Sequence, residues 1–393
     1  MSRSSRRKSD RKGVAINAAS GPSGTSSAEL IAHHVRRACT PRVLEAHVTP
    51  PHLFRLDFAE RLFKRNYRDP VLVTAAPYGH TALSGSGPAT TAGLARECEA
   101  YEALGYDAAA QALNDLVARG AEPLFVHAAL GSGGQGDGAT AGPDVAVRVT
   151  KGLCEACVDA GCALFADHAA AQNLSAVGLP LSVFALGVCE LRRIVDGSEA
   201  EAGDIILGLT SSGLHGEGLD AVRALVRAVS LDLSAAFAGP EAKTVAEALP
   251  SEAAASAEPK ATWAQVLLAP TRVYASDITT VLRHYRVKHV IVGMTPITGG
   301  GLPGSLPRAF GNKLDAEIDR QRWPVPPIFS FLAQHAGLAD AQLWNSFNMG
   351  IGLAMVVRPA FADSIARQLR RRQGQDVHVI GRLVPGTGRV RLA

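Results

Sequence analysis

The sequence predicts an α+β protein with mixed sheets and two domains. Its 393 residues match the length of about two domains, and 47% of them are hydrophobic, which is enough to fill buried cores. Apolar runs of strand length alternate with segments of helical periodicity. This alternation breaks around residues 194–203, where Asp, Gly and Ser interrupt it. We therefore expect an amino-terminal domain over 43–198 and a carboxy-terminal domain over 199–393.

The first 42 residues are predicted to be a disordered basic tail, because they are rich in Ser, Gly, Ala and Arg and lack sustained periodicity. Residues 1–13 have no apolar core of the kind found in secretory signals. No apolar run reaches the roughly 18 to 20 residues that span a bilayer, so we expect a cytoplasmic protein without a membrane partner. Basic runs at 3–12 and 370–372 lack interleaved aromatic residues, so no nucleic-acid partner is expected.

Patterns of secondary structure follow in order through the amino-terminal half. A β-rich run at 71–74 precedes a glycine- and serine-rich loop at 79–93. Residues 101–119 have helical periodicity, because Leu104, Ala108 and Ala112 recur at four-residue steps. A strand, a flexible loop, a helix and two further strands are then expected at 123–130, 131–142, 144–160, 162–165 and 181–189.

Cys154 and Cys157 form a C-x-x-C pair within the predicted helix, and Cys162 follows them. A zinc or redox site needs a second Cys or His pair at metal-site spacing, and none is found. Small thiols packed in the core are therefore the favoured interpretation.

The carboxy-terminal half begins with an apolar strand at 205–209. A stretch rich in Ala, Glu and Pro, about 230–262, is predicted to be an insertion without a core of its own. Residues 347–392 are expected to supply two strands that flank a helix at 359–372.

A glycine-opened turn follows the strand at 205–209. The strand runs into small hydroxyl residues and glycines that precede a helix: Thr210, Ser211, Ser212, Gly213, Gly216 and Gly218. Backbone N–H groups at a helix start, with hydroxyls beside them, favour an anion. His215 lies in this turn and can donate to a phosphate or carry a proton. An ordinary strand–turn–helix with a capping serine explains the same pattern equally well.

Two more segments share this character. An apolar strand ends in a turn formed by Thr298, Gly299, Gly300 and Gly301. Consecutive glycines let backbone amides approach a ligand closely, although a plain flexible loop is the alternative. The third segment begins at Phe347 and places Asn348 beside two glycines at the start of a strand.

These three segments, in this order and with residues 267–274 between the first two, resemble the aminoimidazole ribonucleotide synthetase family, also called phosphoribosylformylglycinamidine cyclo-ligase. Residues 114–124 are similar to the family's long metal-site motif, and the likeness runs from about residue 70 to the end. The resemblance implies a two-domain synthetase fold. It has an amino-terminal mixed β-sheet with helices, a carboxy-terminal α/β sandwich, and a homodimer formed through the amino-terminal sheets.

The resemblance also implies a reaction. ATP with Mg²⁺ phosphorylates the amide oxygen of formylglycinamidine ribonucleotide, and a nitrogen of the same small-molecule substrate then closes the imidazole ring and expels phosphate. By resemblance, Asp107 and Asp115 match acidic positions of the metal site, and His215 matches the histidine of the family's turn. Asp115 and His215 are the catalytic candidates. The two glycine turns and Asn348 are the candidates for binding substrate or phosphate.

The departures from the family fall on its ATP and metal groups, so the ATP/Mg²⁺ site is degenerate. The family's Asp-Gly-Val-Gly-Thr-Lys loop is Pro-Tyr-Gly-His-Thr-Ala at 77–82, without the carboxylate and the lysine. Its Gly-Gly-Glu-Thr-Ala-Glu segment is Ala-Asp-His-Ala-Ala-Ala at 166–171, where Asp167 is the remaining candidate metal ligand. Loss of such charged contacts is expected to cost about 10³ to 10⁵ in rate.

Three functions follow as hypotheses. The first is an ATP-dependent cyclo-ligase of purine biosynthesis with altered metal ligation. The second is a non-catalytic paralogue that binds a nucleotide or phosphate ligand or regulates a true synthetase. The third is a related kinase or synthetase of the thiamine-phosphate, selenophosphate or hydrogenase-maturation type, which is disfavoured because those relatives differ in the triple-glycine and Phe-Asn segments.

Overall fold

Alternating apolar residues build a four-stranded amino-terminal sheet in the order β3-β6-β4-β5. Its strands are β3 (Pro70–Ala75), β4 (Glu122–Gly131), β5 (Ala163–Ala169) and β6 (Leu181–Glu190). Strand β6 pairs antiparallel with β3 and β4, whereas β4 and β5 are parallel. In β6, Leu181, Val183 and Ala185 are buried while Ser182 and Phe184 are exposed. One face of this sheet therefore belongs to the core and the other carries partly exposed side chains.

The computed structural model describes the following residues: 27–40, 43–45, 53–54, 67, 69–76, 91–131, 143–169, 181–237, 261–285, 288–371 and 376–393. The predicted loops at 79–93 and 131–142 lie mostly outside these ranges. Within them, residues 91–93 are helical rather than loop. Two short strands, β1 (Val43–Glu45) and β2 (Leu53–Phe54), pair with each other.

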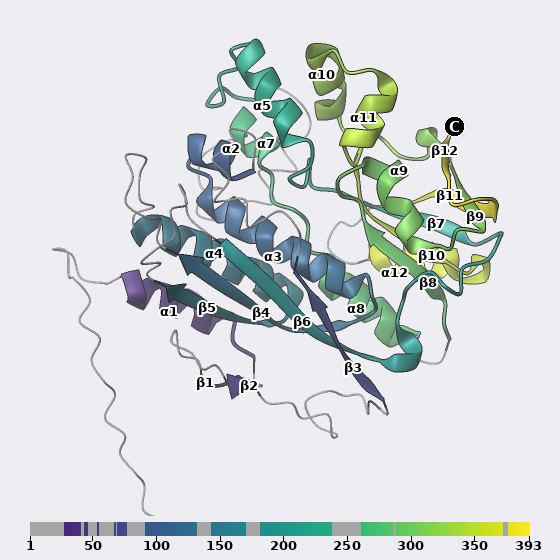
Figure 1. Ribbon diagram of the computed structural model, residues 1–393, viewed down its shortest axis with the longest axis horizontal. Helices are drawn as coiled ribbons and strands as arrows, with labels where there is room; N and C mark the ends of the chain where they lie inside the picture. Colours follow the sequence, from purple (N-terminus) through teal and green to yellow (C-terminus); the bar gives the residue numbers. More distant parts are fainter. Residues whose placement is uncertain are drawn as a thin grey trace, which may run out of the picture.

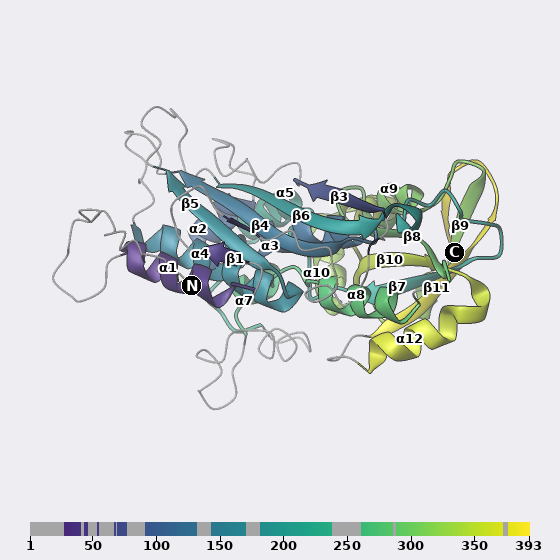
Figure 2. The same ribbon diagram turned by 90° about the horizontal axis from the view of Figure 1, so that it is seen from below.

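Two helices, α3 (Tyr101–Val117) and α4 (Pro143–Ala160), cover the core face of the four-stranded sheet (Figures 1 and 2). Their backbones touch, because a side chain at Gly105 would overlap the Val149 carbonyl and one at Gly152 would overlap the Glu102 carbonyl. Helix α2 (Thr91–Glu97) precedes α3. The glycines thus allow a close helix pair that bulkier residues would separate.

Helix α1 (Ser27–Arg37) packs on α4, so this part of the tail predicted over residues 1–42 is helical, whereas residues 1–26 lie outside the described chain. Ile31, Val35 and Ala38 of this segment are buried in the main core. Their spacing of four and three residues forms an apolar stripe, and α4 supplies the surface that a short helix needs for stability.

The carboxy-terminal domain is built on a six-stranded sheet in the order β12-β9-β11-β7-β10-β8. Its strands are β7 (Ile205–Thr210), β8 (Ile291–Pro296), β9 (Leu314–Ile318), β10 (Ile351–Val357), β11 (Val377–Pro385) and β12 (Val390–Leu392). Every residue of β8 and β10 is buried, so these strands have core on both faces. All pairs are antiparallel except β12 with β9.

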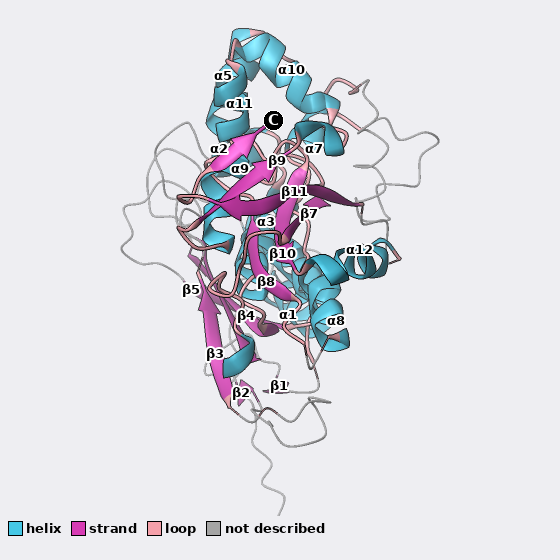
Figure 3. Cartoon of the chain, turned by 90° about the vertical axis from the view of Figure 1, so that its right-hand side faces the viewer, coloured by secondary structure: helices cyan, strands magenta, loops and turns pink. Residues whose placement is uncertain are grey.

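Helices flank both faces of this second sheet. They are α5 (Leu219–Ala228), α7 (Trp263–Leu267), α8 (Ala275–His284), α9 (Gly301–Ser305), α10 (Pro327–Ala336), α11 (Asp340–Ser346) and α12 (Ala362–Arg370). Short 3₁₀ turns are η2 (Leu191–Arg193), η3 (Leu306–Ala309), η4 (Arg320–Arg322) and η5 (Pro359–Phe361). Figure 3 shows α5, α7, α10 and α11 together at the end of the molecule opposite β1–β3. None of the described helices is long and apolar enough to cross a bilayer.

The predicted insertion is closed at its base. Ala236 and Thr262 form an antiparallel bridge, and the Phe237 ring packs edge-on against Trp263 with centroids 4.7 Å apart. Residues 238–260 lie outside the described chain. The ends of the insertion therefore join the core of the carboxy-terminal domain.

One hydrophobic cluster crosses between the two domains. It contains Leu113 and Leu116 of α3 as well as Ile278 of α8 and Met355 of β10. A second cluster fills the opposite side of the six-stranded sheet. The predicted α+β fold with two domains is confirmed, and its two sheets share α3 as a common packing element. Cys154, Cys157 and Cys162 are buried free thiols in the shared cluster.

Candidate functional site

The first glycine turn connects β7 to α5 through residues with left-handed backbone. Gly216 and Gly218 have φ of 74° and 64°, and His215 has φ of 56°. Gly218 is the N-cap of α5, and a side chain there would overlap the Phe347 ring. Only glycine therefore fits at the start of this helix.

His215 fastens this turn to the segment before α8. Its Nε2 accepts hydrogen bonds from the backbone N–H groups of Ser212 (3.0 Å) and Arg272 (3.3 Å). Burial and the neighbouring Arg272 guanidinium lower the pKa of His215 to about 3. The imidazole is therefore neutral with its proton on Nδ1, and Nε2 is already occupied. This geometry favours a positioning role for His215 over the catalytic role expected from the sequence.

The hydroxyls of the turn also bind the protein itself. Ser211 Oγ donates to Asn348 Oδ1 (3.2 Å), and Ser212 Oγ donates to the Pro270 carbonyl (2.5 Å). Thr210 Oγ1 accepts from Arg272 Nη1 at 3.4 Å. The hydroxyl groups predicted to bind a phosphate therefore mostly form hydrogen bonds within the protein.

Asn348, in the third segment, is buried and holds the first glycine turn through hydrogen bonds. Its Nδ2 donates to the carbonyls of Gly213 (2.8 Å) and Leu214 (3.1 Å). Its Oδ1 accepts from the Gly350 N–H (2.9 Å) and from Ser211 Oγ. Both donors and both lone pairs of the amide are thus used within the protein. Asn348 holds the site together and has no group left for a ligand.

The second glycine turn, Thr298 to Gly301, lies under an arginine. Gly300 and Gly301 have positive φ, and a side chain at Gly301 would overlap the Trp344 carbonyl. Arg308 Nη2 donates to Thr298 Oγ1 at 2.8 Å and to the Pro296 carbonyl at 3.2 Å. An exposed guanidinium is therefore fixed beside the turn.

The two glycine turns meet through Glu217, a residue that the sequence analysis missed. The Glu217 carboxylate borders the second turn, because a Cβ atom added at Gly299 would lie 3.6 Å from Glu217 Oε2. Burial raises the pKa of Glu217 to about 7, against the opposing effects of Gly299 and Arg308. Glu217 could have been identified from the sequence, because a negatively charged residue between two glycines is unexpected in a turn that is predicted to bind an anion.

The third element of the site is the segment that precedes α8, which the amino-terminal domain holds in place. The buried Asp107 of α3 accepts a hydrogen bond from the Thr271 N–H at 2.5 Å. Asn114 of α3 donates to the Arg272 carbonyl (2.8 Å) and accepts from the Tyr274 N–H (2.9 Å). Asn114 was not among the predicted site residues, because its partners lie 158 and 160 residues away.

The expected metal ligands do not come together among the described side chains. Asp107 and Asp115 are two turns apart on α3, about 12 Å along the helix axis, and the Asp107 carboxylate is bound to Thr271. Asp167 pairs with Ala129 in the sheet, but its side chain lies outside the described part. Nowhere in that part do three or more His, Cys, Asp or Glu side chains form a group that could hold a metal ion.

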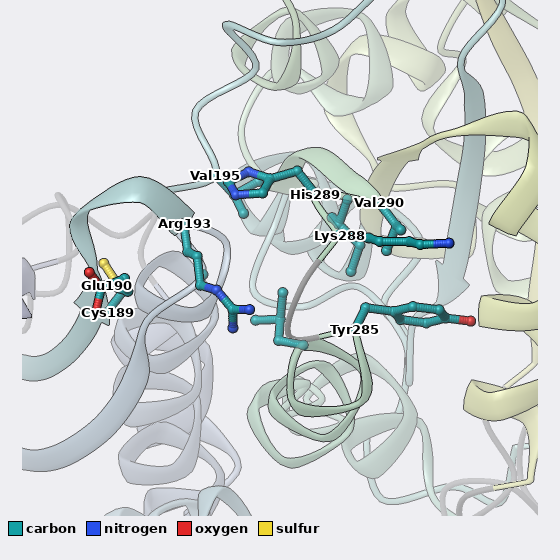
Figure 4. Close-up of a pocket in the computed structure, with 11 residues that line it drawn as sticks. Cys189, Glu190, Arg193, Val195, Tyr285, Lys288, His289 and Val290 are labelled. Atoms are coloured by element: carbon teal, nitrogen blue, oxygen red, sulfur yellow. The ribbon is translucent and has the colours of Figure 1, made fainter. Parts of the chain in front are cut away.

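A pocket at the domain junction lies apart from these turns (Figure 4). Its lining includes Glu190, Arg193, Tyr285, Lys288 and His289 and none of the predicted site residues. Three of its polar groups bind elsewhere. Lys288 Nζ lies 5.1 Å from the centre of the Phe361 ring, Tyr285 donates to Ser364 Oγ (2.7 Å), and His289 Nδ1 is 3.6 Å from a Glu199 oxygen.

Both domains match models of one protein family. The model described as AIR synthase related protein, N-terminal domain, matches residues 87–189, and its C-terminal counterpart matches residues 201–392. A phosphoribosylformylglycinamidine cyclo-ligase from Burkholderia pseudomallei (strain 668) is 36% identical over 319 residues, covering 81% of this chain and 79% of that protein. The family predicted from the sequence is confirmed.

Solved structures share the fold at low sequence identity. A thiamine-monophosphate kinase from Stenotrophomonas maltophilia K279a is 18% identical with a TM-score of 0.59, covering 92% of this chain and 95% of that one. The hydrogenase maturation protein HypE from E. coli is 20% identical with a TM-score of 0.56, covering 94% of each chain. These likenesses extend over both domains.

Proposed function

Because the chain belongs to the AIR synthase related protein family, we propose that it catalyses the ATP-dependent closure of formylglycinamidine ribonucleotide to aminoimidazole ribonucleotide in purine biosynthesis. The observation that carries the proposal is the 36% identity to a cyclo-ligase over 81% of the chain. The likeness includes both glycine turns and the segment that α3 holds between them.

In this proposal, the chain's own residues bind and orient the ribonucleotide. Arg272 and Arg308 supply positive charge beside the two turns, and Arg272 is held to Thr210 only by a long contact of 3.4 Å. Guanidinium groups of this kind suit phosphate oxygens. His215 and Asn348 keep the first turn rigid, so the binding groups are fixed before the substrate arrives.

ATP enters the proposal as the phosphoryl donor, and Mg²⁺ as its counter-ion. The described residues do not fit a magnesium site, because Asp107 is committed to Thr271 and no oxygen-rich cluster surrounds it. Magnesium therefore remains in the proposal only through Asp115 and Asp167.

The test is turnover by the purified full chain supplied with formylglycinamidine ribonucleotide, ATP and Mg²⁺. We expect ADP and aminoimidazole ribonucleotide in equal amounts, measured by chromatography. Arg308→Gln should lower kcat/KM by about 10- to 100-fold, the value of one or two charge-assisted hydrogen bonds. Arg320→Gln is the matched control, because Arg320 binds Asp340 on the surface at 2.8 Å. Absence of both products above the buffer background contradicts the proposal.

A second function, a non-catalytic ribonucleotide- or phosphate-binding paralogue, is favoured by one observation. The Glu217 carboxylate places a negatively charged group beside Gly299, whose N–H the sequence offered to a phosphate. Such a protein should bind formylglycinamidine ribonucleotide in a calorimeter without producing ADP. Full growth rescue of a strain that lacks the synthetase would exclude it.

The chain is further proposed to form a homodimer through the open face of the four-stranded sheet. Leu72 and Phe184 are 51% and 36% exposed there. The register pairs Leu72 with Val188 and Phe184 with His127, so both belong to the same face. Sedimentation should give a dimer for the native chain and a monomer for the Leu72→Glu/Phe184→Glu variant. Val229→Glu, an exposed position on the other domain, should leave the mass unchanged.

A further inference from the structure

Glu217 stands at the point where the two glycine turns approach each other. Its backbone lies between Gly216 and Gly218 in the first turn, and its carboxylate reaches the second turn at Gly299. A side chain at Gly299 would meet only one atom within 4 Å, Glu217 Oε2 at 3.6 Å. The surface beside Gly299 is therefore open, and the carboxylate borders it.

The Glu217 carboxylate has more acceptor capacity than its surroundings fill. An ionised carboxylate offers about four lone-pair positions, and burial outweighs the effect of the Gly299 N–H on the pKa of Glu217. Arg308 is the cation that faces it, but this guanidinium donates to Thr298 Oγ1 and to the Pro296 and Ser305 carbonyls. His215, in the same turn, is neutral. The raised pKa of Glu217 agrees with a carboxylate that lacks donors.

A phosphate group is a poor occupant of this position. Its negative charge would lie against the carboxylate. A cationic amidine is the better match. It is planar, it carries parallel N–H donors, and it pairs with a carboxylate in the two-point manner of an arginine guanidinium.

We propose that Glu217 is the specificity-determining residue that binds the amidine of formylglycinamidine ribonucleotide. The amidine end of the substrate then lies at Glu217 and Gly299, and its phosphate end lies toward the Arg272 guanidinium beside the first turn. This inference rests on the proposed function, since it takes its ligand from the proposed reaction.

The experiment compares two ligands by calorimetry with the full chain in the absence of ATP. One is formylglycinamidine ribonucleotide, and the other is the corresponding amide, in which oxygen replaces the amidine nitrogen. We expect the native chain to bind the amidine about 10- to 100-fold more tightly than the amide, as a charge-assisted pair would give. In Glu217→Gln, which keeps the size of the side chain and one acceptor oxygen, this preference should disappear while amide binding changes less than about threefold.

The preference for the amidine should depend on pH if Glu217 binds it, and should not depend on pH if Glu217 has only a structural role. As pH rises from 6 to 8, the carboxyl ionises and the native preference for the amidine should grow. Glu217→Gln should show no such change. Glu217→Asp keeps the charge on a shorter arm and should retain a weaker preference. It serves as the test variant if the Gln variant does not fold.

Several results would overturn the inference. The first is that the native chain binds both ligands with equal affinity or binds neither. The second is that Glu217→Gln keeps the native preference for the amidine. The third is that inorganic phosphate, in competition with substrate, binds Glu217→Gln more tightly than it binds the native chain. Turnover is measured separately. A native chain that turns over while Glu217→Gln keeps its preference refutes the inference alone, whereas a Glu217-dependent preference without turnover refutes the proposed function alone.

Discussion

Tyr274 donates its backbone N–H to Asn114 Oδ1 at 2.9 Å, and this bond joins the two domains at the site. The Asn114 side-chain amide also donates to the Arg272 carbonyl. One side chain of α3 therefore pairs with two backbone groups of the segment whose Arg272 N–H binds His215. The Tyr274 hydroxyl in turn donates to the Thr210 carbonyl at 2.8 Å. The position of the first glycine turn therefore depends on a helix of the other domain.

Replacement of Asn114 by alanine should destabilise the protein by about 2 to 4 kcal/mol, because it leaves the Arg272 carbonyl and the Tyr274 N–H buried without partners. Urea unfolding measures this change. Asn345→Ala is the matched control, since Asn345 is exposed and donates only to the Ala341 carbonyl of its own helix. Equal stabilities of the two variants would show that the α3 contact contributes nothing.

His215 should stay neutral with its proton on Nδ1 from pH 5 to pH 8. The reason is that burial and Arg272 lower its pKa to about 3 while Nε2 accepts two backbone N–H groups. Stability from this group is present above the normal histidine pKa and is lost as pH falls toward 3. Nitrogen-15 NMR of the imidazole reports the tautomer directly. A titration near pH 6.5 would instead support His215 as a proton carrier.

Asp107 should make the protein less stable as pH rises. Burial raises its pKa from 3.8 to about 7, so the folded state keeps a proton that the unfolded state releases between these values. The contribution favours folding below pH 3.8 and is lost as pH rises through 7, by up to about 4 kcal/mol. Asp107→Asn should flatten this slope in unfolding free energies measured from pH 4 to 8. Asp340→Asn, at an exposed position, should keep the native slope.

Gly218→Ala should cost more stability than Gly161→Ala, although both glycines have positive φ, 64° and 69°. At Gly161 no atom lies within 4 Å of the added methyl group, so only backbone strain of about 1 kcal/mol is expected. At Gly218 the methyl group also overlaps the Phe347 ring, which adds about 1 to 3 kcal/mol. Thermal melting of the two variants measures the difference. Similar melting temperatures would mean that Phe347 moves aside freely.

The periodic elements were predictable because their signal is local. The helix expected at 101–119 is α3 (Tyr101–Val117), and the one expected at 144–160 is α4 (Pro143–Ala160). Helix α1 was missed because its apolar stripe is short and lies within a stretch whose composition is that of a tail. Its stability comes from packing on α4, more than 100 residues away, and the local composition cannot predict that contact.

The site was predictable in outline but not in its contacts. The sequence indicated the two glycine turns as candidates for binding substrate or phosphate, and the structure places Glu217 of the first turn beside Gly299 of the second. The sequence did not indicate that the side chains of His215 and Asn348 form hydrogen bonds within the protein rather than with a ligand. Those bonds depend on partners such as Arg272 and Gly213, which lie 57 and 135 residues away and become neighbours only in the folded chain.

The hydrophobic cluster that runs from α3 into β10 has a consequence for how the molecule comes apart. A cut at the exposed Leu191 would divide the chain into two pieces, each with a wide apolar surface that its own residues do not cover. Such pieces should be insoluble when made singly and should recover a native spectrum when refolded together. The two halves are therefore expected to fold only as complements of each other.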